Sequence, residues 1–221
     1  RGQVSEMGSR TVMSITRDLA SKLTPPKDQP LSNRIRVALH VPETSERAPD
    51  YRILRSVGTR GYPAKSYCTY AVETEPGIHA LLIRLSEEAL TSRLPRGKKA
   101  ILYVSHRSAD GELREEALVK ELVVGDDEAA VFAMDVRGIG ESQPDTCGKD
   151  QFLRQYGSDY FYAAHGEMLR RPVLGMRTFD VLSVIKLLAE TGHESIHLVA
   201  RGWGALPASL AAVLAPQVTR I

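Results

Sequence analysis

The residues best placed to do chemistry lie near the carboxyl end of the chain, where residues 195–208 read SIHLVARGWGALPA. A short apolar run at 196–200 leads into a tight turn of small residues, and an apolar helical pattern follows. A strand–turn–helix of this kind presents a nucleophilic serine when the turn reads G-x-S-x-G. Here Gly202 occupies the serine position, between Ala200 and Gly204. The sequence therefore keeps the turn and lacks the hydroxyl group that would attack a carbonyl carbon.

Physical reasoning about the turn supports this interpretation. The residue at its tip has a strained backbone angle, and glycine adopts such angles at little steric cost. We therefore predict a positive φ at Gly202. The flanking residues are Arg201 and Trp203, and the backbone N–H of Trp203 stands where such a turn donates to an oxyanion. No catalytic residue is predicted in this segment.

Two further loops carry polar residues after strand-like runs. Ser105 and His106 follow the apolar run KAILYV (99–104) and are a candidate pocket or oxyanion loop. The alternative is a solvated loop, because no base is paired with Ser105 in the sequence. The other loop has the pattern D-x-R-G-x-G-x-S, and its charged pair could act as acid and electrophile. The favoured role of this pair is structural: charge-assisted hydrogen bonds that hold the loop in place. Its residues are Asp135, Arg137, Gly138, Gly140 and Ser142.

The elements that must position these loops follow from hydrophobic periodicity. An opening hairpin precedes alternating strands and helices, which predicts an α/β fold with a mostly parallel sheet. The stretch 137–172 reads as long and irregular. The helix at 176–190 is apolar except for a narrow stripe that includes Asp180 and Ser183. The predicted strands are 67–73, 78–85, 99–104, 129–134, 196–200 and 218–221, and the other predicted helices are 113–123 and 205–214.

The chain divides near residue 50. Residues 1–50 read as an N-terminal helix at 10–23 followed by a linker rich in proline, serine and charge, with an ordered piece at 35–41. Residues 51–221 carry the α/β pattern. They form the second predicted unit, a partial domain.

Four stretches in order carry a family resemblance: YAVETEPGIHALLIRL (70–85), AMDVRGIGES (133–142), MLRRPVLGMRTFDVLSVIKLL (168–188) and the strand–turn–helix at 196–214. Together they resemble α/β-hydrolases of the acetylxylan-esterase-like group. The resemblance implies an α/β-hydrolase-like sheet with an N-terminal antiparallel hairpin, truncated after the sixth-strand region, and ancestral ester chemistry. Family members place Ser, then Asp or Glu, then His in chain order. The positions of the last two would follow the strands beyond this sequence.

The leading functional hypothesis is thus a degenerate, non-catalytic domain of a larger carbohydrate-ester hydrolase. The alternative is a pocket-forming part of an active carboxylesterase whose nucleophile, acid and histidine lie in another domain or chain. A nucleotide-binding α/β domain is a minor alternative, because Gly202-x-Gly204 lacks the third glycine of that motif. The expected partner is a further domain or second polypeptide that completes the fold, together with a carbohydrate ester. The resemblance alone implies a secreted or periplasmic location.

Composition and residue spacing limit the classes of partner and ligand that the sequence predicts. A net charge of +2, with scattered basic residues, gives no indication of a nucleic-acid or membrane partner. No spacing of His, Cys, Asp or Glu predicts a metal, and no cofactor is predicted. Cys68 lies in a strand-like run, so a buried free thiol is favoured over a disulfide with Cys147.

Overall fold

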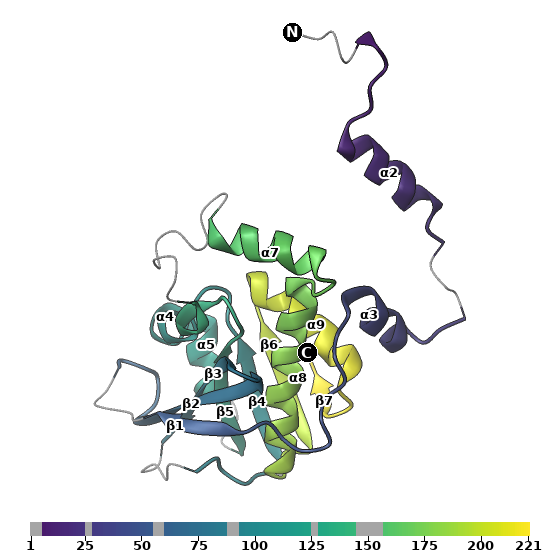
Figure 1. The fold of residues 1–221 in the computed structure, drawn as a ribbon. Coiled ribbons are helices and arrows are strands. Elements are labelled where there is room, and N and C mark those ends of the chain that lie inside the picture. The colour runs from purple at the N-terminus through teal and green to yellow at the C-terminus, as the bar shows by residue number, and fades with distance from the viewer. Residues whose placement is uncertain (1–5, 25–27, 55–59, 88–92, 125–127, 145–156) are drawn as a thin grey trace.

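A seven-stranded mixed sheet forms the centre of the protein (Figure 1). The computed structural model describes residues 6–24, 28–54, 60–87, 93–124, 128–144 and 157–221. The strand order is β1-β2-β3-β5-β4-β6-β7. The strands are β1 Tyr51–Leu54, β2 Ser66–Glu75, β3 Ile78–Ser86, β4 Lys99–Val104, β5 Ala129–Asp135, β6 Ser195–Ala200 and β7 Val218–Arg220.

The sheet is antiparallel on one side and parallel on the other. β1, β2, β3 and β5 pair antiparallel, whereas β5, β4, β6 and β7 pair parallel. The opening hairpin and the mostly parallel sheet predicted from the sequence are confirmed. The pairing of the strand at Val218 beside residues 196–200 is confirmed as well. Because parallel strands end at the same edge, the loops after β4, β5 and β6 meet there.

Two sequence expectations about the helices are wrong. The helix predicted at 113–123 is two helices, because Ser108 caps a helix that begins early and Glu116 is extended. The stretch 137–172, predicted to be irregular, contains a helix at 158–168. The helices are α2 Val12–Lys22, α3 Leu31–Leu39, α4 Ala109–Glu115, α5 Ala117–Val124, α7 Ser158–Met168, α8 Val173–Glu190 and α9 Ala205–Leu214.

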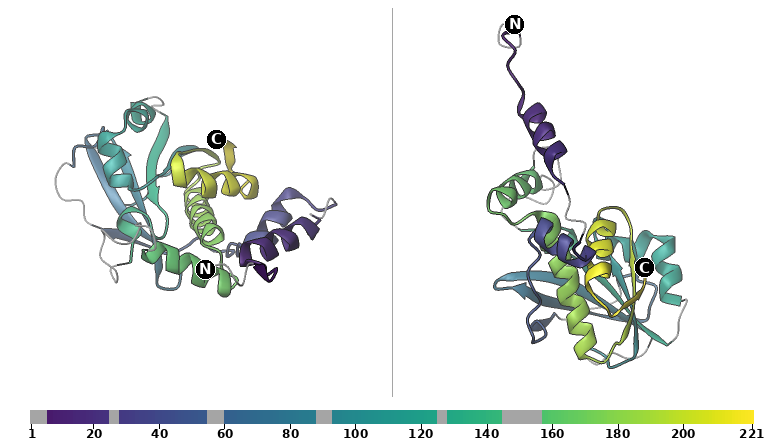
Figure 2. Two further views of the ribbon diagram at one scale, coloured as in Figure 1. Left: turned by 90° about the horizontal axis from the view of Figure 1, so that it is seen from above. Right: turned by 90° about the vertical axis from the view of Figure 1, so that its right-hand side faces the viewer.

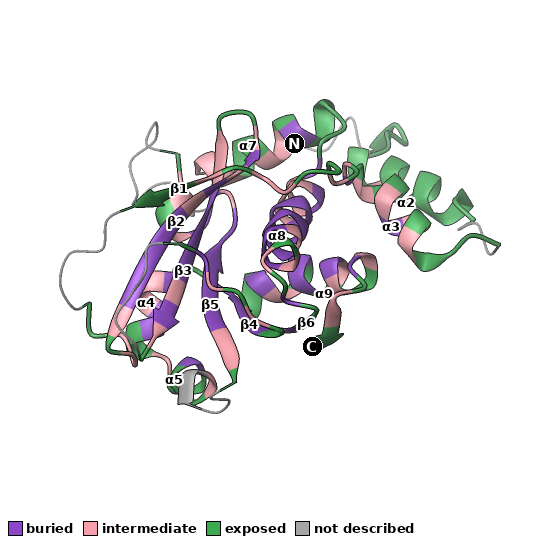
Figure 3. Ribbon diagram, turned by 90° about the horizontal axis from the view of Figure 1, so that it is seen from below, coloured by how far each residue is buried: buried purple, intermediate pink, exposed green. Residues whose placement is uncertain are grey.

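Helices cover both faces of the sheet, as Figures 2 and 3 show. On one face, side chains such as Leu102 pack against α8 and α9. On the other face, Ile101 and Tyr103 pack with Leu113 of α4 and Val119 of α5. β4 is buried on both faces because it lies in the middle of the parallel part, between β5 and β6. Cys68 is a buried free thiol, as predicted, while Cys147 lies outside the described residues.

The polar stripe predicted on α8 is buried at Asp180 and Ser183 and exposed further along the helix, at Glu190, which forms an ion pair with Lys186. Asp180 is fully buried and Ser183 is nearly so, because the hairpin β2–β3 and the loop after β5 lie over this part of the helix and supply partners. The hydroxyl group of Ser183 instead donates to the carbonyl of Phe179. An acid inside an otherwise apolar helix therefore marks a buried polar contact here.

The two helices in the first fifty residues differ in how they contact the rest of the protein. α3 contacts α8 and α9, and Val41 joins the main core. α2 buries none of its residues and extends away from the body in Figure 1 and in the right view of Figure 2. In the part of the chain that the structure describes, no helix is long and apolar enough to cross a membrane.

Candidate functional site

Three loops meet at the carboxyl edge of the parallel strands. Val104 of β4 is in register with both Met134 of β5 and Ala200 of β6, so the residues that follow these strands emerge side by side. This arrangement brings together the Ser105–His106 loop, the loop that begins at Asp135, and the turn at Gly202. Most of the residues singled out in the sequence are therefore in one region, at the end of strands that the core holds in place.

Gly202 has the backbone conformation predicted from the sequence. Its φ is +53°, in the left-handed region, and it begins the short 3-10 turn Gly202–Gly204 that leads into α9. A β-carbon at Gly202 would lie only 2.7 Å from Cγ and 2.8 Å from Cε1 of the His106 ring. The space into which a side chain at this position would project is therefore occupied by His106.

His106 also engages the backbone donor of the turn. The N–H of Trp203 donates to Nδ1 of His106 across 3.0 Å, so Nδ1 carries no proton and the neutral ring is protonated at Nε2. The indole of Trp203 lies edge-on to the imidazole, with ring centroids 5.5 Å apart. The N–H that would stabilise an oxyanion at such a turn is thus already bound within the protein.

A second set of backbone donors on the neighbouring loop is also occupied. The carboxylate of Glu112 accepts from the N–H groups of His106, Arg107 and Ser108 at 2.7–3.1 Å. It also accepts from the hydroxyl group of Tyr103 at 2.6 Å. Burial disfavours the charged carboxylate, but these hydrogen bonds outweigh burial and lower the pKa of Glu112 below its usual value.

Sequence reasoning missed Glu112 and Tyr103. The signal available was an acidic residue in the first turn of a helix, a position that favours negative charge beside unpaired N–H groups. It went unused because the helix was expected to begin at residue 113. No local sequence pattern predicts the role of Tyr103, because it looks like one more apolar residue of a buried strand.

Asp135 joins the loop after β4 to the loop that it begins itself after β5. Its carboxylate accepts from the Ser105 hydroxyl group at 2.6 Å, from the Ala109 N–H at 2.7 Å and from the Glu141 N–H at 3.1 Å. Burial raises the pKa of Asp135 to about 6, and the hydrogen bonds oppose that rise. Ser105 is 1% exposed, so its hydroxyl group faces this carboxylate and not the solvent.

The side chain of Arg137 connects the loop after β5 to α8 and to the β2–β3 hairpin. Its guanidinium binds Asp180 through Nε at 2.9 Å and through a second nitrogen at 2.5 Å, and it reaches Glu75 at 2.7 Å. Its backbone N–H also donates to Asp180 at 2.9 Å. The geometry is that of a buried ion pair linking the loop to α8 and to the hairpin.

The remaining predicted loop residues hold backbone in place. Ser142 Oγ accepts from the Leu81 N–H at 3.0 Å and donates to the Asp135 carbonyl at 3.2 Å. Gly138 and Gly140 have φ values of 76° and 53°. A β-carbon at Gly140 would overlap the Asp135 carboxylate, so only glycine allows the loop to close over it.

The outer residues of the turn make contacts of their own. Arg201 forms an ion pair with Glu116, the residue between α4 and α5. Gly204 approaches the end of β4 so closely that a β-carbon there would lie 3.0 Å from the carbonyl carbon of Val104. Trp203 is 42% exposed, and its indole lies edge-on to the His106 ring.

A cavity of about 540 Å³ lies beside the loop that follows β5. Arg137, Gly138 and Ser142 line it, together with residues of the hairpin, α7 and α8. Among the residues that the structure describes, no three His, Cys, Asp or Glu side chains gather in a way that could hold a metal ion.

Comparison with known proteins gives structural matches only. No protein-family model matches the sequence, and no curated protein matches it. A proposed acetyl xylan esterase from Bacteroides fragilis superposes with a TM-score of 0.67 at 12% identity, covering 95% of this chain and 59% of that protein. Acetyl xylan esterase 1 from a Thermoanaerobacterium species gives a TM-score of 0.51 at 14% identity, covering 95% of this chain and 61% of that one.

A third match is an acetyl xylan esterase from a Paenibacillus species, with a TM-score of 0.50 at 17% identity. It covers 94% of this chain and 62% of that protein, so this chain spans about three fifths of the length of each match. At these identities the likeness concerns the fold. The chain therefore has an α/β-hydrolase fold of the kind found in acetyl xylan esterases.

Proposed function

We propose that this chain is a non-catalytic α/β-hydrolase domain, one part of a larger carbohydrate-ester hydrolase. The observation that carries the proposal is the His106 imidazole at the turn, where it fills the side-chain space beside Gly202 and accepts the N–H of Trp203. Ester hydrolysis by this fold needs a nucleophile at the turn and free donors for the oxyanion.

The hydrogen bonds around the turn support the same conclusion independently of Gly202. The N–H groups of residues 106–108 lie in the loop that follows β4, and Glu112 binds all three. A substrate oxyanion would have to displace a carboxylate that is held by four donors, counting Tyr103. An acceptor already in place makes the loop rigid and unreactive.

The hydroxyl groups nearby are also poorly placed to attack an ester. Ser105 is buried and donates to Asp135, and Ser142 is bound between two backbone groups. Neither serine has a histidine within hydrogen-bond reach among its described contacts, and a serine nucleophile needs such a base. The proposed role of the domain is therefore structural, as a scaffold or interface, or as a carbohydrate contact.

A serine-directed fluorophosphonate probe and an acetate-ester assay test the proposal. We expect the native chain to be unlabelled at residues 196–208, at Ser105 and at Ser142, and to leave 4-nitrophenyl acetate and acetylated xylan unhydrolysed. Gly202→Ser should also stay inactive towards both esters, because Nδ1 of His106 already accepts the N–H of Trp203. The double variant Gly202→Ser with His106→Gly should stay inactive because it has no histidine beside the new hydroxyl group. Labelling of Ser105 or Ser142 in the native chain, with ester turnover that Ser→Ala abolishes, contradicts the proposal.

A further inference from the structure

His193 is a fully buried histidine in the short connection 191–194, between the end of α8 and the start of β6. Its ring packs edge-on against Phe132 of β5, with ring centroids 5.9 Å apart. The connection lies at the amino ends of β4 and β6, so it is at the opposite end of the strands from the loops around Gly202. An imidazole in this position is a titratable group that the core has to hold in one protonation state.

The hydrogen bonds of the ring fix its tautomer. Nδ1 of His193 lies 3.1 Å from the carbonyl oxygen of Leu188 and 2.9 Å from Oγ1 of Thr191. The carbonyl can only accept, and the Thr191 hydroxyl group already donates to that same carbonyl, so Nδ1 carries the proton. Nε2 is therefore an acceptor in the neutral ring. It is buried and has no hydrogen-bond partner among the residues that the structure describes.

The backbone before β4 lies against this unpartnered nitrogen. A β-carbon at Gly97 would be only 3.1 Å from Nε2, so Gly97 packs on that edge of the ring. The N–H groups of Glu194 and Ser195 both donate to the carbonyl of Lys98, at 3.0 and 3.1 Å. The α8–β6 connection and the segment 93–98 are thus joined directly beside the imidazole.

The charged groups around the ring give it no carboxylate partner in the described part of the chain. Burial lowers the pKa of His193 below its ordinary value of 6.5; the hydrogen bond to Leu188 opposes this change, and the charge of Arg84 on β3 adds to it. A proton at Nε2 would therefore place an uncompensated charge in the core, which is costly. The other charged residues of the surrounding segments are Lys186 and Glu190 of α8, which pair with each other, the exposed Glu194, and Arg93, Arg96, Lys98 and Lys99 of the chain that leads into β4.

We propose that His193 is a pH-sensitive switch that controls the contact between the α8–β6 connection and the segment 93–98. The neutral ring keeps the contact closed, because Nδ1 binds the end of α8 and Nε2 carries no charge that water must solvate. Uptake of a proton at Nε2 draws the ring towards water and separates the two segments. The stability that the neutral ring contributes is complete above the ordinary histidine pKa and is lost as the pH falls through the lowered pKa of the folded state. This inference does not depend on the chain being non-catalytic.

Amide hydrogen exchange at about pH 7.5 and about pH 5, on either side of the ordinary histidine pKa, tests the switch. With rates corrected for the direct effect of pH on exchange, protection of residues 93–98 and 188–195 in the native chain should fall about tenfold or more at the lower pH. Protection of 131–134, in the middle of the sheet, should stay constant. In His193→Asn, protection of both segments should be the same at the two pH values, because the amide side chain does not titrate.

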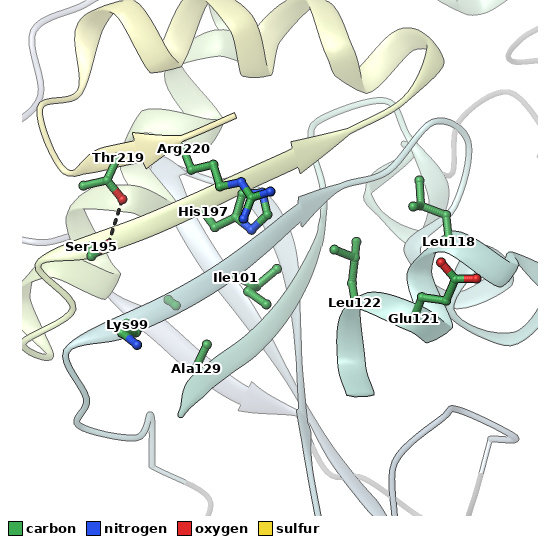
Figure 4. A pocket seen from close by; sticks show the side chains of 11 residues that line it. Lys99, Ile101, Leu118, Glu121, Leu122, Ala129, Ser195, His197, Thr219 and Arg220 are labelled. Atoms are coloured by element: carbon green, nitrogen blue, oxygen red, sulfur yellow. Dashed lines mark hydrogen bonds between the residues drawn. The ribbon is translucent and has the colours of Figure 1, made fainter. Parts of the chain in front are cut away.

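His197 of β6 supplies the matched control. Side chains alternate along a strand, so His197 points to the face opposite to the buried Ile196, where it lines a cavity of about 430 Å³ (Figure 4). His197→Asn removes a histidine from the same strand and leaves the ring of His193 in place. This variant should therefore keep the pH response of the native chain at 93–98 and 188–195.

Proton–nitrogen NMR correlation spectra of the imidazole rings follow the protonation of His193 without any substitution. They should show the tautomer protonated at Nδ1 at the higher pH, and uptake of a proton at Nε2 only together with the loss of protection. Unchanged protection in the native chain, protonation of His193 while both segments stay protected, or an equal pH response in His193→Asn would overturn the proposal.

Discussion

The backbone N–H of Trp203 and the imidazole of His106 are joined by a 3.0 Å hydrogen bond across the loops that follow β6 and β4. The two residues are 97 positions apart in the chain, and the parallel pairing of β4 with β6 brings them together. The bond holds the turn at Gly202 against the loop that follows β4. It makes the turn part of the packing between two loops.

Gly202→Ala should destabilise the protein, and His106→Ala should relieve part of that cost. A left-handed φ costs a non-glycine residue about 1–2 kcal/mol, and the overlap with the His106 ring adds about 1–3 kcal/mol. In the His106→Ala background, only the cost of the left-handed φ remains for Gly202→Ala. Urea unfolding of the two single variants and the double variant measures the coupling. Strictly additive changes in the free energy of unfolding would show that the ring does not crowd residue 202.

Asp180→Asn should cost about 1.5–3 kcal/mol of unfolding free energy, because it removes the buried charge that binds Arg137 while Glu75 remains as a second counter-ion. Arg47→Ala removes an ion pair that is exposed on both sides and should cost less than about 1 kcal/mol. Thermal and urea unfolding of the two variants give the comparison. Similar small losses for both would mean that the Arg137–Asp180 pair contributes no more than a surface pair.

Asp135 should make the folded state less stable as the pH rises from about 4 to about 7. Its pKa is about 6 when folded, against 3.8 for the unconstrained group, so the native state keeps its proton while the unfolded state loses it. The contribution is complete below pH 3.8 and is lost as the pH passes 6; the two pKa values differ by about 2, worth about 3 kcal/mol.

Urea unfolding of the native chain and of Asp135→Asn across this range isolates the contribution. The stability advantage of the native chain over Asp135→Asn should shrink with rising pH, and pH profiles that stay parallel would contradict the assignment. Glu112→Gln is the matched control with the opposite sign. The pKa of Glu112 is lowered, so its contribution is present above the ordinary glutamate pKa and is lost on acidification.

Much of the fold was predictable from the sequence because local patterns carried it. Apolar runs such as 99–104 and 129–134 marked buried parallel strands, and the turn at Pro76-Gly77 marked the hairpin. The positive φ at Gly202 followed from a steric rule that applies to any such turn. Periodicity failed where a cap or a buried contact intervened, as at Ser108 and at Asp180.

The sequence by itself determined the α/β pattern, the turn at Gly202 and the absence of a hydroxyl group there. Only the tertiary structure decided that the His106 ring fills the side-chain space at Gly202, that Glu112 binds the neighbouring N–H groups, and that Asp135 binds Ser105. The physical reason is distance along the chain. Sheet register and burial, which no local pattern encodes, set which side chains from separate strands meet, which protons they share and how their pKa values change.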